Sequence, residues 1–145
     1  MLRTDLLRAA RTQCEALVGL VAELDPDEVP LSQATAVYAE LDRIVRVASA
    51  ARVLVARRVD EAQEWKRRGH RTAAEALAAA SGSSLGAARD ELAASNALSG
   101  LPATRDRMLE GKLSANQATV IADAAAANPG AEAALLDAAG TANLH

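Results

Sequence analysis

Hydrophobic positions recur along most of the chain at steps of three and four residues, the spacing of one face of an α-helix. Over residues 3–24 this apolar face includes Cys14, which is therefore predicted to be a core residue. The acidic, proline-containing stretch 25–30 ends this helix, because each proline disfavours helical geometry in the residue before it. A second stripe runs from Val37 to Trp65 and predicts one long helix over about 32–68.

The predicted long helix is too long for a compact domain of this size. Unbroken over 32–68, it would span roughly 55 Å at ~1.5 Å per residue, whereas a compact chain of this length has a radius of gyration near ~15 Å. Part of the helix is therefore expected to project or to pack on something else. The near-heptad spacing of its stripe favours a partner helix, either the first helix folded back or a second subunit.

After Gly69 the sequence predicts short helices separated by glycine, serine and proline. Two of them begin with a predicted capping box, Thr72 with Glu75 and Ser114 with Gln117, in which each side chain bonds to the backbone N–H of the other residue. The last helix is expected to end at Gly140. The predicted ranges are 72–80, 85–98, 103–110, 114–127 and 131–139.

The composition supports helices and gives no sign of strands. Ala accounts for 37 of the 145 residues, and it is the strongest helix former and a poor strand former. There is no Phe, so burial must come from close helix contacts around Leu and Val. The predicted fold is an all-α multi-helix bundle, a single domain over 1–145 that consists of a long helical hairpin (3–68) and a short-helix part (72–139).

Charge is unevenly distributed, although the net charge is only −3. Segment 1–31 carries three basic and six acidic residues, segment 32–71 nine and five, and segment 72–145 four and eight. Cations at the end of the long helix complement the negative end of its macrodipole, but their number exceeds that need. They are predicted to contact DNA phosphates, and they comprise Arg57, Arg58, Lys66, Arg67, Arg68 and Arg71.

The segment 72–98 has the spacing of a helix-turn-helix unit. Ala78, Gly82 and Ala88 supply a small residue, a turn residue that tolerates left-handed geometry and an apolar contact on the second helix. Arg89 and Asn96 are the predicted base contacts. A short hairpin in an Ala-rich chain gives the same spacing by chance, so both interpretations stay open. Asp90 and Glu91 would bring negative charge toward the DNA. The polar residues that the second helix is expected to present are Ser84, Arg89, Asp90, Ser95 and Asn96.

Little in the sequence supports catalysis or metal binding. The chain has two histidines and one cysteine, whereas a tetrahedral zinc site needs four nitrogen or sulfur ligands. A one-metal nuclease needs a histidine base with further ligands close by, but His70 is expected to be exposed among cations and His145 lies at the terminus. We therefore expect no catalytic site, no metal and no cofactor in this chain.

The sequence also predicts a soluble, cytoplasmic protein. No apolar run approaches the roughly 18–20 residues that span a bilayer. Charged residues at positions 3, 5 and 8 interrupt the start, where a secretory leader would need an apolar run. The single cysteine cannot form an internal disulfide and fits a reducing compartment. No membrane partner and no small-molecule substrate are expected.

Four spaced motifs follow one another along the chain. They are Trp65-x3-Gly69, Leu77-Ala78-x3-Gly82-x-Ser84-x3-Ala88-x3-Leu92, Leu98-x2-Leu101-Pro102, and Gly111-x-Leu113-Ser114-x2-Gln117-Ala118-x2-Ile121-Ala122. Their order and spacing resemble those of the 13E12 repeat family, also called domain of unknown function 222, over nearly the whole chain. One departure is Ala76, where a large aromatic residue is expected before the Leu-Ala pair.

Members of this family typically carry an HNH endonuclease domain after the helical region. The resemblance therefore implies that this chain is the non-catalytic module of such a nuclease, with the HNH domain expected beyond residue 145. Asn143 and His145 are not expected to belong to a metal-binding ββα unit. Two functions stay open: the module binds DNA through segment 57–71 and delivers it to the nuclease, or it is a protein-interaction module whose long helix forms a homodimer.

Overall fold

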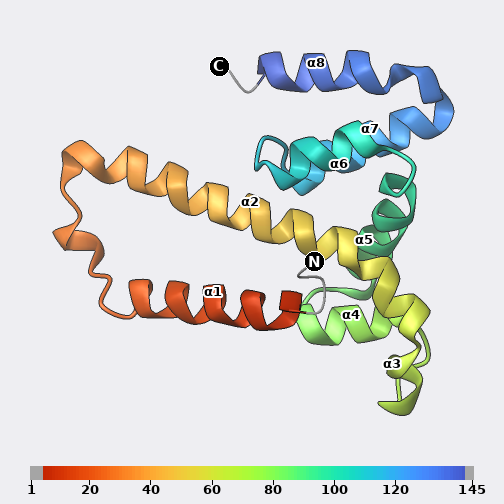
Figure 1. Cartoon of the computed structure of the whole chain (residues 1–145), viewed down its shortest axis with the longest axis horizontal. Coiled ribbons are helices and arrows are strands. Elements are labelled where there is room, and N and C mark those ends of the chain that lie inside the picture. The colour runs from red at the N-terminus through yellow and green to blue at the C-terminus, as the bar shows by residue number, and fades with distance from the viewer. Residues whose placement is uncertain (1–4, 143–145) are drawn as a thin grey trace. The chain divides into compact units, whose positions relative to one another are not determined.

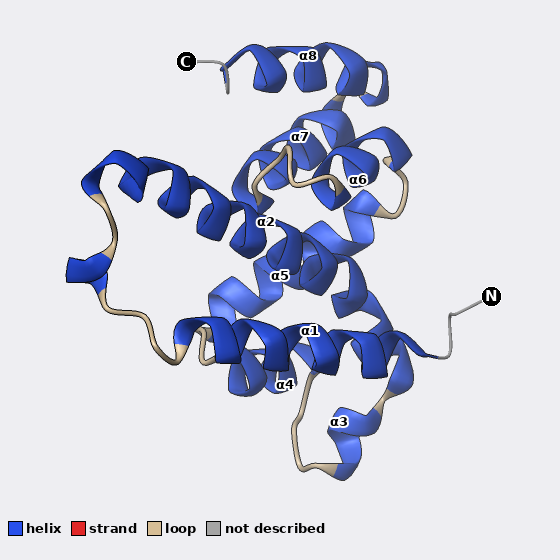
Figure 2. Cartoon of the chain, turned by 60° about the vertical axis from the view of Figure 1, so that its left-hand side comes forward, coloured by secondary structure: helices blue, strands red, loops and turns tan. Residues whose placement is uncertain are grey.

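The computed structural model describes residues 5–142, and this part of the chain contains eight α-helices and no strand (Figures 1 and 2). The prediction of an all-α multi-helix fold is confirmed. Two short 3₁₀ helices, Pro26–Glu28 and Pro129–Ala131, follow α1 and α7. The α-helices are α1 (Leu6–Val21), α2 (Leu31–Ala62), α3 (Glu64–Arg67), α4 (Ala73–Ser81), α5 (Leu85–Leu98), α6 (Pro102–Leu109), α7 (Ala115–Ala127) and α8 (Glu132–Ala142).

The long helix α2 is shorter than predicted, because the backbone leaves helical geometry at Gln63. This residue has φ +58°, in the left-handed region, and α3 begins directly after it. The Asp60 carbonyl oxygen at the end of α2 accepts the backbone N–H of Gln63 at 3.2 Å and the indole N–H of Trp65 at 3.3 Å. These bonds satisfy the helix end, so the prediction of one helix reaching Arg68 is wrong.

The chain divides into two compact units, the first ending at Ala39 and the second beginning at Glu40, within α2. In the first unit α1 has no buried residue, and Cys14 is exposed. The prediction of a buried Cys14 is therefore wrong. The apolar periodicity of α1 does produce a helix, but its large side chains, such as Leu6 and Val18, stay accessible to solvent.

The core of the second unit is built from small and aliphatic side chains. Alanines allow the helix backbones to approach closely, as expected for a chain without Phe. Within α2 only Ala50, Val53 and Ala56 are buried, all in its second half. The core residues come from α2, α5, α6, α7, α8 and the loop before α7: Ala50, Val53, Ala94, Leu98, Met108, Leu113, Ala118, Ile121, Ala122 and Leu136.

Side-chain caps fix where the short helices begin. The Thr72 hydroxyl accepts the backbone N–H of Glu75 at 3.2 Å and opens α4. The Glu75 carboxylate accepts the N–H of Arg71 at 2.7 Å instead of that of Thr72, so this predicted capping box is only half formed. The box at Ser114 has both bonds and is confirmed. Helix α8 continues through Gly140 instead of ending there as predicted.

Candidate nucleic-acid interface

The cations predicted to contact phosphate fall into two groups. Arg57 and Arg58, near the end of α2, both bind the Glu61 carboxylate: Arg57 Nη1 lies 3.3 Å from Oε1, and Arg58 Nη1 bonds to Oε2. One carboxylate thus serves two guanidinium groups. Part of the positive charge of this pair is used within the protein, which reduces what it offers to an external anion.

The second group, the α3 cluster, comprises Lys66, Arg67, Arg68 and Arg71 on α3 and the loop that follows it. All four residues are exposed. Among the described residues, none of them forms an ion pair with a carboxylate. The Lys66 ammonium lies 5.3 Å from the centroid of the Trp65 ring and 3.2 Å from Gln63 Oε1, both uncharged groups. Figure 2 shows α3 next to the loops that join it to α2 and α4.

Trp65 holds the backbone that carries this cluster. In addition to the bond from its indole to Asp60, its carbonyl oxygen accepts the backbone N–H of His70 at 3.0 Å. Gly69 has φ +84°, which lets the chain turn toward α4 without strain. Trp65 and His70 are both half-buried, so His70 is less exposed than the sequence predicted. The ring therefore packs within the segment that positions the four cations.

Helices α4 and α5 are joined by a short turn at the predicted positions. Gly82 has φ +69° and ends α4, with its N–H bonded to the Ala78 carbonyl oxygen. The Ser84 hydroxyl accepts the backbone N–H of Ala87 at 3.0 Å and begins α5. Ala88 is completely buried, as an apolar contact on the second helix requires.

Part of α5 faces α2 and is not available to DNA. Ser95 is only 1% exposed, and its hydroxyl accepts the backbone N–H of Arg57 at 3.0 Å and contacts the Leu54 carbonyl oxygen at 3.5 Å. The Glu91 carboxylate accepts the Arg52 Nε–H at 3.0 Å across the same contact. The prediction that α5 presents Ser95 to DNA is therefore wrong, and the pairing of Glu91 with Arg52 offsets its negative charge.

Arg89 and Asn96, the predicted base-contact residues, are exposed on α5. They are seven residues apart, about two helical turns, and so share one face of the helix. Neither side chain has a hydrogen bond or an ion pair with another described residue. Asp90 is also exposed. The Ser84 hydroxyl, by contrast, already caps α5.

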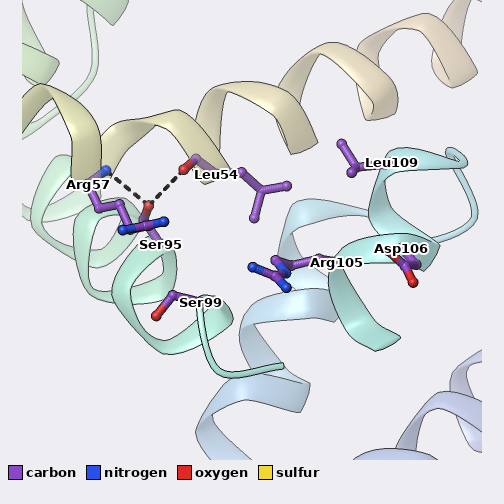
Figure 3. Close-up of a pocket in the computed structure, with 7 residues that line it drawn as sticks. All are labelled: Leu54, Arg57, Ser95, Ser99, Arg105, Asp106 and Leu109. Carbon is purple, nitrogen blue, oxygen red and sulfur yellow. Dashed lines mark hydrogen bonds between the residues drawn. The ribbon is translucent and has the colours of Figure 1, made fainter. Parts of the chain in front are cut away.

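A pocket between α2, α5 and α6 was not predicted from the sequence. It has a volume of about 300 Å³ (Figure 3). Arg105 on α6 is the cation that sequence reasoning missed, because nothing along the chain connects it with the arginines of α2. The pocket is lined by Leu54, Arg57, Ser95, Ser99, Arg105, Asp106 and Leu109.

The described residues contain no group of three or more His, Cys, Asp or Glu side chains placed to hold a metal ion. Asn143 and His145 lie outside the described residues. Within residues 5–142, no helix has both the length and the apolar character needed to cross a membrane.

Comparisons with known proteins give no match: no family model, no curated protein and no solved structure matches this chain. The resemblance to the 13E12 repeat family stays a prediction from the spaced motifs. Many residues of those motifs lie in the core of the second unit, including Leu98, Leu113, Ala118 and Ile121. These motif positions determine how the helices pack, and they do not themselves form the exposed cationic surface.

Proposed function

We propose that this chain is a non-catalytic DNA-binding module whose α3 cluster contacts the phosphate backbone. The observation that carries the proposal is four exposed cations within residues 66–71 that no described carboxylate pairs. Double-stranded DNA carries one negative charge per ~1.7 Å of helix axis, so a compact cluster of cations can contact several phosphates at once. Neutralising them releases counterions, which drives binding to any sequence.

Helix α5 is the element that we assign to base reading in this proposal. Arginine matches the edge of guanine and asparagine that of adenine in the major groove, and Arg89 and Asn96 share one exposed face. The α3 cluster precedes the helix-turn-helix directly in the chain. Phosphate contacts by the cluster would position the module, and base contacts by α5 would give it sequence preference.

In the full-length protein, this module would position DNA for an HNH nuclease domain. That part of the proposal depends on the resemblance to the 13E12 repeat family, in which such a domain typically follows the helical region. We also propose that the module acts in the cytoplasm, because a single cysteine fits a reducing compartment.

Charge reversal tests the role of the α3 cluster. The double variant Arg67→Glu, Arg68→Glu should weaken binding to all duplex sequences about equally, by at least roughly tenfold, because phosphate contacts do not read bases. The matched control is Arg8→Glu, Arg11→Glu on α1, which changes the net charge by the same amount at two exposed positions. Fluorescence anisotropy measures the affinities, and circular dichroism must show unchanged helicity in both variants.

The result that would remove the α3 cluster from the proposal is equal DNA affinity in the two double variants. At ~0.1 M salt the Debye length is about 10 Å, so a reversed charge acts mainly on nearby phosphates, and a loss confined to the α3 variant reports contact at this cluster.

Self-association is a second candidate function, favoured by the exposed apolar side chains of α1 and α2. Val37, Ile44 and Val47 are all more than a third exposed. The apolar stripe on α2 has near-heptad spacing. A facing helix with the same spacing can pack against it, with the apolar side chains of each helix inserted between those of the other. A second copy of this chain supplies such a helix, so we propose a homodimer through α2.

The dimer is tested by sedimentation equilibrium over a range of concentrations. Ile44→Glu should weaken the dimer, because it would place an unpaired charge in the contact. Gln33→Glu, an exposed polar position on the same helix, is the control and should leave the mass unchanged. A wild-type chain that stays monomeric at high concentration would exclude this function.

A further inference from the structure

The pocket between α2, α5 and α6 brings two arginines together from distant parts of the chain. We propose that it binds a phosphate monoester, with the oxyanion between Arg57 and Arg105 and a small apolar body against Leu54 and Leu109. This site goes beyond the proposed function, because no residue of the α3 cluster lines the pocket.

The two guanidinium groups face the same hollow. Arg57 comes from α2 and lies beside Ser95, whereas Arg105 comes from α6 and extends toward α2 and α5 (Figure 3). Arg105 is half-buried, and no described carboxylate pairs with it. Its neighbour Asp106 lies at the other end of the pocket from Arg57 (Figure 3). A partly desolvated guanidinium without a partner favours the arrival of an anion.

Arg57 is only weakly held by its own partner. Its Nη1 lies 3.3 Å from Glu61 Oε1, beyond the ~2.7–2.9 Å of a strong charge-assisted bond, and Arg58 shares the same carboxylate. The guanidinium of Arg57 therefore has donors left for a ligand. Together Arg57, Arg58, Glu61, Arg105 and Asp106 carry a formal net charge of +1, so the surroundings of the pocket attract an anion.

The remaining polar groups of the pocket are already engaged. The Ser95 hydroxyl bonds to the backbone of α2, and the Ser99 hydroxyl donates to the Asn96 carbonyl oxygen at 2.6 Å. Recognition of a ligand thus depends on the two guanidinium forks, whose planar geometry matches phosphate oxygens in pairs.

The volume of the pocket limits the size of the group attached to the phosphate. About 300 Å³ is at the lower end of the ~300–1,000 Å³ of ligand pockets, enough for an oxyanion and a ring-sized body. Leu54 and Leu109 supply the apolar wall for that body. A bare inorganic phosphate would leave this wall uncovered, so a monoester is favoured over the free ion.

Phenyl phosphate is the probe, titrated into the 145-residue chain and followed by ¹H–¹⁵N NMR of the backbone amides and the arginine Nε–H groups. We expect saturable shifts at Ser99 and Arg105. Arg105→Gln should weaken binding by at least about tenfold, because it removes charge-assisted hydrogen bonds. Arg43→Gln is the matched control: it removes an exposed arginine of α2 outside the pocket and should bind like wild type.

Two further arms complete the test. A short DNA duplex that displaces phenyl phosphate would show that the pocket takes a phosphodiester of the DNA backbone and would overturn the monoester, whereas retention of phenyl phosphate supports a free monoester. The Arg67→Glu, Arg68→Glu variant should keep its affinity for phenyl phosphate, so failure of the DNA proposal and failure of this site are separable. Shifts that do not saturate, or equal affinity in Arg105→Gln and wild type, would overturn the proposal.

Discussion

Replacing Ser95 with alanine probes the contact that sets α5 against α2. The hydroxyl is buried and accepts the backbone N–H of Arg57 at 3.0 Å (Figure 3). In a regular helix that N–H donates to the carbonyl oxygen of Val53, four residues earlier. Ser95→Ala therefore removes the hydrogen-bond partner that α5 supplies to this N–H of α2.

The magnitude follows from the two contacts of the hydroxyl. A net hydrogen bond contributes about 0.5–1.5 kcal/mol, and a buried donor left unsatisfied costs about 1–3 kcal/mol. The second contact, to the Leu54 carbonyl oxygen at 3.5 Å, is at the limit of hydrogen-bond geometry and adds little. We expect the free energy of unfolding to fall by about 1–2 kcal/mol, which lowers the urea midpoint by roughly 1 M.

Urea unfolding followed by circular dichroism measures this change. Ser99→Ala, directly after the last residue of α5, is the control, because Ser99 is exposed and water can replace its bond to the Asn96 carbonyl oxygen. The control should change the stability by less than about 0.5 kcal/mol. Equal midpoints for the two variants would show that the Ser95 hydroxyl does not hold α5 against α2.

Two other substitutions test the core and the surface. Leu98→Ala should lower the free energy of unfolding by about 2–5 kcal/mol, because Leu98 is completely buried. Leu109→Ala is the control and should lower it much less, because Leu109 is 52% exposed. Equal urea midpoints for the two variants would contradict the assigned core. The Lys112 ammonium, 2.9 Å from the Glu110 carboxylate, lowers the pKa of Glu110 through a hydrogen bond and charge attraction. The pairing of Glu110 with Lys112 therefore stabilises the folded protein above the usual pKa of Glu, and this stabilisation is lost as the pH falls through the lowered pKa of Glu110. Lys112→Gln should raise this pKa in an NMR pH titration, and an unchanged pKa would contradict the pairing.

The short helices could be predicted from the sequence because their signals are local. The capping box at Ser114 and the left-handed turn at Gly82 each depend on a few neighbouring residues. The end of α2 had no such signal, since Gln63 is neither glycine nor proline and its geometry accompanies a bond from Trp65 to Asp60. Capping and turn residues thus predicted where the short helices begin, whereas no local signal predicted where α2 ends.

Burial was harder to predict than helix formation. The stripe that includes Cys14 identifies a face that can be buried, but periodicity does not show whether a partner covers it. Ser95 was predicted to face DNA but is buried against α2. A serine in a helix gives no indication in the sequence that its hydroxyl bonds to another helix.

The candidate site was predicted only where its residues are neighbours in the chain. The α3 cluster is visible as a run of cations, and the spacing of Arg57 and Glu61 by four residues could have indicated their pairing. Arg57 and Arg105, by contrast, meet only because α2, α5 and α6 pack together. No pattern along the chain connects them.

The salt dependence of duplex DNA binding tests the central claim most directly. If the four cations of the α3 cluster neutralise phosphates, the slope of log affinity against log salt should be about −3.6, so a fourfold rise in salt should weaken binding by roughly two decades. Removing two of the cations in Arg67→Gln, Arg68→Gln should reduce the slope to about −1.8. Absence of measurable DNA binding at low salt, or a wild-type slope near zero, would contradict the proposed role of this chain.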